Sequence, residues 1–168
     1  MKYLLLIMAT WGFSTFTGLA QNQEQDKAVI EGQIDLFFKD WENHNFENMV
    51  NYATEDSDWV NVVGMWWKNR KEVVYAHNVF HKVMFKNTKL TKTSVHTRFI
   101  TNDVAVVRLY WHMGEYTTPS GNHHNEAENI AMMVFVKKAE KWLLTATENL
   151  VIEEAAQKSN PVNRMPKE

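Results

Sequence analysis

The stretch DWENHNFENMVNYATEDSDWVNVVGMWWKNR, residues 40–70, decides the fold of this chain. It starts at the end of an amphipathic helix, after which Asn45 can cap a short second helix over residues 46–53. A polar turn at residues 54–57 then leads to a short strand over residues 59–63, which Gly64 ends. The stretch therefore predicts two helices and one strand in close succession.

The sequence on either side of this stretch has two different periodicities. Upstream, a helix is predicted over residues 26–43, and downstream Asn69 can cap a third helix over residues 71–85, because apolar residues recur every three or four positions. From residue 90 the apolar period changes to two, which predicts strands. The four predicted strands span residues 92–101, 104–115, 125–138 and 141–153.

Helices followed by a run of hairpin-connected strands indicate an α+β fold. The inner face of the sheet needs cover, and three helices can supply it. We therefore expect a cone-shaped, curved antiparallel sheet wrapped over three N-terminal helices, with a cavity at the open end of the cone.

The N-terminus has the pattern of a secretory signal peptide over residues 1–20. Lys2 supplies a positive charge, an apolar run follows, and Gly18-Leu19-Ala20 ends in small residues. We expect cleavage after Ala20 and a secreted or periplasmic protein. The alternative is a retained membrane anchor over residues 3–20. The rest divides into a flexible N-terminus at 21–26, one domain at 27–153 and a polar tail at 154–168.

Composition excludes several classes of function. The chain of 168 residues contains no Cys, which excludes disulfides, thiol nucleophiles and Cys-zinc sites. A net charge of −2 argues against a nucleic-acid partner, and we expect no membrane contact after signal cleavage. No glycine-rich phosphate loop occurs, so we expect no cofactor. Seven Trp in a small chain indicate a large core, an aromatic-walled pocket, or both.

The order of these motifs resembles SnoaL-like members of the nuclear transport factor two-like superfamily, which include ketosteroid-isomerase-like and polyketide-cyclase-like proteins. The resemblance rests on Trp41, His44, residues 58–70, NDVAVVRLYW at 102–111 and VFVKKAEKWLLTATEN at 134–149, and it covers about residues 27–152. It implies a cystatin-like half-barrel, and an activity such as isomerisation, dehydration or cyclisation that needs no cofactor. Asn45 stands where the family pattern has Asp, which removes one carboxylate.

Glu148 is the first candidate catalytic residue. Strict alternation places it on one face of the last strand with Trp142 and Leu144, and a desolvated carboxylate there would have a raised pKa, as a general acid or base requires. The alternative is a solvated or ion-paired Glu at the rim. The resemblance adds His44 as a second candidate base, with Asn61 or Tyr110 as a hydrogen-bond donor to an enolate.

A ligand pocket is also indicated by aromatic residues interspersed with a few polar ones. The alternative is that the same aromatic side chains simply fill the core, and at least one of Trp66 and Trp67 should face a rim or a partner subunit. The candidate ligand-binding residues are Trp41, Trp59, Asn61, Trp66, His77 and Tyr110.

The histidines permit a metal site, but the pattern argues against one. His77 and His81 stand four apart on one predicted helix, while His123 and His124 lie in a predicted hairpin loop at residues 117–124, and Glu126 follows that loop. There is no HExxH motif and no Cys ligand, and His77 falls on the apolar stripe of its helix. We therefore expect no metal and a hydrogen-bonded core imidazole at position 77.

Two functions fit these patterns. The first is an exported domain that binds a small apolar or aromatic molecule in the cone. The alternative is a cofactor-independent enzyme that transfers a proton through a cavity carboxylate or histidine. We also expect a homodimer through the sheet face, using Arg108, Tyr110 and His112; the sequence leaves open which row of the strand at 104–115 faces the cavity.

Overall fold

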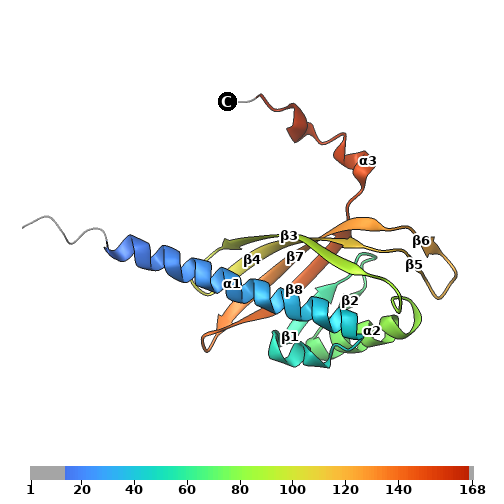
Figure 1. Cartoon of the computed structure of the whole chain (residues 1–168), viewed down its shortest axis with the longest axis horizontal. Helices are drawn as coiled ribbons and strands as arrows, with labels where there is room; N and C mark the ends of the chain where they lie inside the picture. Colours follow the sequence, from blue (N-terminus) through green and yellow to red (C-terminus); the bar gives the residue numbers. More distant parts are fainter. Residues whose placement is uncertain (1–13, 167–168) are drawn as a thin grey trace, which may run out of the picture.

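A computed structural model describes the backbone of residues 14–166 and the side chains of residues 22–166 (Figure 1). The predicted leader, residues 1–20, lies largely outside these residues, and the rest forms an α+β domain as expected. Its elements are α1 (Ser14–Asn43), η1 (Glu47–Asn51), β1 (Ala53–Val60), β2 (Trp66–Trp67), α2 (Arg70–Val83), β3 (Leu90–Phe99), β4 (Val104–Met113), β5 (Tyr116–Thr117), β6 (His123–His124), β7 (Ala127–Lys138), β8 (Lys141–Val151), α3 (Glu154–Gln157) and η2 (Pro161–Arg164).

The main sheet has the strand order β2-β1-β8-β7-β4-β3. β3, β4, β7 and β8 pair antiparallel, as expected, but β1 pairs with β8 in parallel. The expected curved antiparallel sheet therefore includes one parallel neighbour, β1, which makes the sheet mixed. The reason is that the long connection from β1 through α2 and the intervening strands lets the chain return beside β1 in the same direction.

The three N-terminal helical elements lie on the inner face of the curved sheet, and Figure 1 shows α1 crossing that face. α1 contacts β3 and β8, while α2 contacts β1 and β2. The buried core between these layers comes from Ile30 and Ile34 on α1 and from the inward side chains of the sheet, including Val107, Met133, Phe135, Trp142 and Leu144.

The structure shows which row of side chains on β4 faces the helices, a point that the sequence left open. Its apolar row, which includes Ala105, Val107 and Leu109, is buried against the helices, whereas Arg108 on the mixed row is exposed. The mixed row therefore forms the outer face of the sheet and does not line a pocket between the sheet and the helices.

The region around the first strand differs most from the prediction. Residues 54–57, expected as a polar turn, belong to β1, because the side chains of Thr54 and Ser57 turn into the protein while Glu55 and Asp56 face solvent. The short second helix is a 3₁₀ helix, and Asn45 Oδ1 accepts a hydrogen bond from Glu47 N at 3.1 Å, close to its expected capping role.

The other turns follow the sequence more closely. Asn69 caps α2, since its Oδ1 accepts from Glu72 N at 3.0 Å. Ala139 and Glu140 turn the β7–β8 hairpin with positive φ angles of 47° and 61°. The predicted hairpin loop at 117–124 contains the small β5–β6 ribbon, and the tail contains α3 and η2.

α1 also includes residues 21–26, which the sequence predicts as a flexible N-terminus. Asp26 is tied to the end of β7, where Lys137 Nζ lies 3.1 Å from its Oδ1. Among the helices that the structure describes, none is long and apolar enough to cross a membrane.

Candidate histidine and aromatic site

A cluster of histidines and aromatic rings fills the space between α1, η1, α2 and β1. We call it the histidine cluster, and it has two buried imidazoles at its centre, His77 and His81, which are 6% and 2% exposed. The surrounding rings are those of Phe37, Trp41, Phe46, Trp59, Trp67 and Phe85.

His77 is held as a neutral imidazole with a defined tautomer. Its Nδ1 lies 2.9 Å from the carbonyl oxygen of Val73, which can only accept, so Nδ1 carries the proton and donates it. Burial lowers the pKa of His77 to about 4. At neutral pH its Nε2 therefore has a lone pair, and the ring is enclosed by Phe37, Phe46, Trp59 and Trp67 at centroid distances of 4.7–5.8 Å.

His81 forms a pair with His44 from the end of α1. The two Nδ1 atoms lie 2.8 Å apart, so one donates and the other accepts. Burial lowers the pKa of His81 to about 4, with further lowering by the charges of His44 and His77. Its buried Nε2 has no hydrogen-bond partner in the structure.

His44 takes an unusual backbone conformation to make this contact. Its φ is 52°, and the bonds His44 N to Trp41 O and Asn45 N to Asp40 O close the C-terminus of α1 in a Schellman arrangement. Glycine usually occupies this left-handed position, although His is among the residues that tolerate it. The arrangement directs the His44 ring toward α2.

Phe46 separates the two buried imidazoles. Its ring centroid lies 4.7 Å from that of His77 and 4.9 Å from that of His81. The two histidines are one helical turn apart, and both imidazoles pack against this one aromatic ring. Among the described residues, no group of three or more His, Cys, Asp or Glu side chains is arranged to hold a metal.

A second set of polar groups lies next to His77 on the inner face of the sheet. Trp59 Nε1 donates to Asn149 Oδ1 at 2.8 Å, which joins β1 to β8. Ser57 and Thr147 lie on the same two strands, 0% and 4% exposed, and their hydroxyl oxygens have no hydrogen-bond partner in the structure. Buried hydroxyls of this kind are uncommon and call for an explanation.

A β-bulge places Asn149, and not Glu148, on this inner face. Val134 pairs with Ala146 but Phe135 pairs with Leu144, so Thr145 is an extra residue in β8. One inserted residue reverses the facing of every later side chain on the strand. The prediction that Glu148 shares a face with Trp142 and Leu144 is therefore wrong, and its carboxylate is exposed on the outer face.

Similar structures place the fold in context. A crystal structure of an uncharacterized protein with a cystatin-like fold from Caulobacter vibrioides superposes with a TM-score of 0.80 at 28% identity, covering 83% of this chain and 98% of that one. An NTF2-like protein with a cystatin-like fold from Novosphingobium aromaticivorans gives a TM-score of 0.68 at 16% identity, covering 88% and 97%. The chain has the cystatin-like fold of NTF2-like proteins.

A third NTF2-like neighbour carries an enzyme-like name. It is a ketosteroid isomerase-like protein from Erwinia carotovora, with a TM-score of 0.61 at 15% identity, covering 75% of this chain and 95% of that one. No family model and no curated protein matches the sequence. These similarities establish the fold of the domain, and its chemistry has to be argued from its own residues.

The structure brings together only some of the residues predicted for the site. Trp41, Trp59 and His77 belong to the histidine cluster, and His44 reaches it from the surface. The other three predicted ligand-binding residues, Asn61, Trp66 and Tyr110, lie outside this cluster.

Asn61 organises the β1–β2 turn, where its Oδ1 accepts from Val63 N and Met65 N. Trp66 is 56% exposed, whereas Trp67 packs on His77, so the expectation that one of the two faces outward is met. Tyr110 lies on the outer face of the NTF2-like sheet, 5.9 Å from the ring of His96.

Sequence reasoning missed Asn149, Thr147 and Ser57 as candidate site residues. The alternation of side chains along β8 gives no sign of the bulge at Thr145, so it predicts Glu148 on the inner face. Ser57 was hidden because four consecutive polar residues, 54–57, have the composition of a turn.

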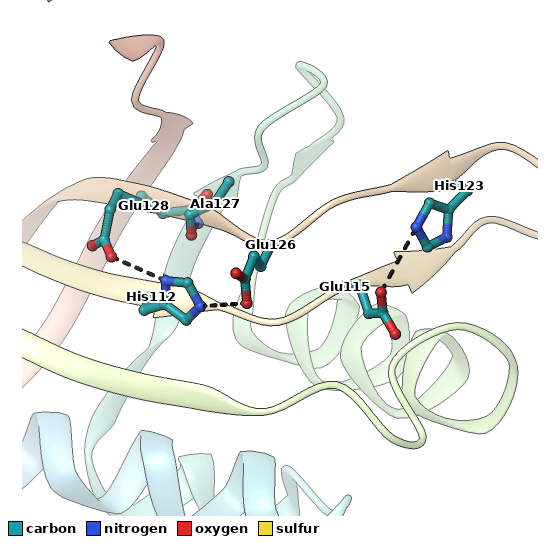
Figure 2. Close-up of polar contacts among 7 residues, drawn as sticks. His112, Glu115, His123, Glu126, Ala127 and Glu128 are labelled. Carbon is teal, nitrogen blue, oxygen red and sulfur yellow. Dashed lines mark hydrogen bonds and ion pairs between the residues drawn. The ribbon is translucent and has the colours of Figure 1, made fainter.

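A separate polar cluster lies on the outer face, at the end of the sheet near the β5–β6 ribbon (Figure 2). His112 lies between two carboxylates, with Nδ1 3.0 Å from Glu128 Oε1 and Nε2 3.3 Å from Glu126 Oε2. These contacts, led by that to Glu128, raise the pKa of His112. Both carboxylates contact the same imidazole and are substantially exposed, which fits solvated strand ends.

An open groove lies outside the histidine cluster. It has a volume of about 1820 Å³ and runs along the outer side of α2, and its wall includes Tyr75, Val79 and Trp67. Trp67 also contacts His77, with ring centroids 5.2 Å apart. One indole ring therefore separates this groove from the buried imidazole.

Proposed function

We propose that this NTF2-like chain is an exported domain that binds a small, partly apolar molecule between the inner face of the sheet and the helices, beside Trp59, Asn149 and His77. The observation that carries the proposal is the pair of buried hydroxyls at Ser57 and Thr147, which have no protein partner next to an aromatic wall. Leaving a buried polar group unpaired costs about 1–3 kcal/mol, which a hydrogen-bonding ligand would offset.

The surrounding chemistry suits such a ligand. Four aromatic rings around His77 supply apolar contact, while Asn149, Ser57 and Thr147 supply a few hydrogen bonds on one side. Apolar walls with a small number of placed polar groups are typical of small-molecule sites.

A thermal-shift screen of small aromatic and alicyclic compounds tests this function. We expect at least one compound to raise the melting temperature of the wild-type chain, and the rise to be lost in Asn149→Ala. The matched control is Asn125→Ala, an exposed asparagine in the loop before β7, which should keep the full shift. A screen without any stabiliser, or equal shifts in both variants, would contradict the proposal.

The second candidate function is a cofactor-independent enzyme that transfers a proton. Its support is His77, a neutral imidazole with its proton on Nδ1 and a lone pair on Nε2, and the ketosteroid isomerase-like neighbour of the same fold. A pKa of about 4 makes His77 a weak base at neutral pH, so ligand binding ranks first. Any activity found should be lost in His77→Gln and retained in Glu148→Gln.

The partner that we propose is a second copy of the chain, bound through the outer face of the sheet. Met132 is 40% exposed there, and its strand neighbours on that face, Ile130 and Val134, are half-buried. Light scattering at tens of micromolar should give the mass of a dimer, and a strict monomer would contradict this partner.

Export rests on the leader pattern at residues 1–20. N-terminal sequencing of the protein recovered from the periplasm or the medium should begin at Gln21. Retention of the protein in the membrane fraction with Met1 in place would favour the anchor alternative.

A further inference from the structure

The β1–β2 turn presents a set of exposed apolar side chains. Val63 is 68% exposed, Trp66 56% and Met65 49%. Single exposed apolar residues are ordinary, but three within four consecutive positions form a patch that indicates a binding partner. We call these three residues the apolar turn.

The backbone of the apolar turn is held rigid by hydrogen bonds inside it. Asn61 Oδ1 accepts from Val63 N at 3.1 Å and from Met65 N at 2.9 Å, while Asn61 N donates to Met65 O and Gly64 N to Asn61 O. Gly64 adopts a φ of 79°, which side chains rarely allow, so the turn needs glycine there. Four N–H groups are thereby satisfied without water.

Further exposed apolar residues lie at the same end of the sheet. β1 and β8 run parallel, with Val60 opposite Glu148, so the turn after β1 and the last residues of β8 lie at one end. There Leu150 is 54% exposed and Val151 39%. The apolar surface therefore extends from the turn to the neighbouring strand.

A cation accompanies the exposed indole. Lys68 Nζ lies 5.5 Å from the centroid of the Trp66 ring, and Trp66 Nε1 donates to Asp58 Oδ2 at 2.8 Å. A tryptophan with its N–H engaged and a lysine beside it is the combination found where proteins meet the headgroup layer of a bilayer.

We propose that the apolar turn docks this chain on the surface of a lipid bilayer. Val63, Met65 and Trp66 would enter the boundary between headgroups and acyl chains, and Lys68 would contact lipid phosphates. A lipid surface fits better than a protein partner because the apolar side chains protrude from a tight turn, and a bilayer accepts a protruding tip without a matching pocket. The internally bonded N–H groups also lower the cost of leaving water.

This docking goes beyond the proposed ligand binding and does not depend on it. It also departs from the expectation, drawn from the sequence, that the chain has no membrane contact after signal cleavage. The contact proposed is peripheral and uses a turn, not a spanning helix.

Vesicle binding of the full chain tests the proposal. The chain would carry Trp11→Phe, so that the leader contributes no indole signal, and would be mixed with vesicles of phosphatidylcholine alone or with phosphatidylglycerol. We expect brominated acyl chains to quench part of the tryptophan fluorescence, and this quenching to be lost in Trp66→Phe. Val63→Ser with Met65→Ser should weaken vesicle partitioning about tenfold or more, since two apolar side chains would no longer transfer from water into the bilayer. The matched control is Tyr75→Ser with Val83→Ser on α2, which are 72% and 60% exposed and should leave partitioning unchanged.

Three results would overturn the proposal. One is equal partitioning of the turn variant and the wild type, which would assign any binding to the leader. Another is binding that needs phosphatidylglycerol and vanishes in Lys68→Gln alone, which would indicate charge adsorption only. The third is the absence of vesicle binding, which would leave a protein as the partner of the apolar turn. The thermal-shift screen contains no lipid, so it reports on ligand binding separately.

Discussion

The Nδ1 atoms of His44 and His81 lie 2.8 Å apart, joining the last turn of α1 to the last turn of α2. His44 makes this contact from a left-handed backbone position with φ 52° that usually favours glycine. One side chain of the pair is exposed and the other is 2% exposed, so the pair connects solvent to the histidine cluster.

Replacing His44 should change the titration of its partner. In His44→Gly the backbone keeps its left-handed turn without strain, but the charge that helps to lower the pKa of His81 is removed. We expect the pKa of His81 to rise from about 4 toward its ordinary value. NMR titration of the His81 ring measures it, and an unchanged pKa would show that burial alone sets the value.

The two buried histidines should make the fold sensitive to acid. Burial lowers the pKa of both His77 and His81 from 6.5 to about 4. The folded state then binds protons less readily than the unfolded state, so their contribution to stability is complete above about pH 6.5 and falls as the pH drops toward 4. The fully enclosed His77 should account for roughly 3 kcal/mol over that window, and His81 for less, because its Nδ1 contacts the exposed His44.

Denaturant unfolding between pH 4.5 and 7.5 measures this loss. His77→Phe should flatten the slope of unfolding free energy against pH, because one of the two linked groups is gone. The control is His96→Asn, whose side chain is exposed and whose loss should leave the slope as in the wild type. A wild-type stability that is flat across this range would contradict the burial of neutral histidines.

The hydrogen bond from Trp59 to Asn149 should contribute more to the free energy of unfolding than the hydrogen bond from Trp66 to Asp58. Trp59→Phe removes a 2.8 Å hydrogen bond and leaves a gap in a site that is 6% exposed, which should cost about 2–3 kcal/mol. Trp66→Phe removes a bond of the same length to Asp58 at an exposed site and should cost about 0.5 kcal/mol or less. Urea unfolding of both variants gives the comparison, and equal costs would contradict the inward position of Trp59.

The proposed dimer predicts a specific effect of charge on the outer sheet face. Met132→Lys should separate the subunits, because it places an ammonium in the centre of the proposed interface. Ile100→Lys is the matched change, since Ile100 is 49% exposed at the β3–β4 turn, away from that face. Sedimentation should show a monomer for Met132→Lys and a dimer for Ile100→Lys. If both variants sediment as dimers, the outer sheet face is not the interface.

The packing of the helices on the sheet could be predicted from the sequence, because long amphipathic patterns indicate which side of a helix or strand is buried. The α1 stripe containing Ile30 and Ile34, and the β4 row containing Val107 and Leu109, are buried as their periods predict. The parallel pairing of β1 with β8 could not be predicted in this way, since alternation says which face is buried but not which strand is the neighbour.

The candidate site was harder to predict for two physical reasons. One extra residue at Thr145 exchanges the inner and outer faces of β8, so Asn149 replaces Glu148 beside Trp59. The pairing of His44 with His81 spans 37 residues and depends on a left-handed helix end without glycine, which composition does not reveal. Trp41 and Trp59 could be predicted because aromatic residues concentrate at residues 37–67, and His77 because it falls on the apolar stripe of its predicted helix.

We propose that a ligand binds at the inner face of the sheet beside Trp59. The indole N–H signals of ¹⁵N-labelled protein report directly on this binding. On addition of the strongest stabiliser from the thermal-shift screen, the Trp59 signal should move, since its Nε1 donates to Asn149 within the proposed site. The Trp66 signal should stay in place, because that indole is exposed on the β1–β2 turn. A shift of Trp66 with Trp59 unmoved would contradict the claim and transfer the ligand site to the surface.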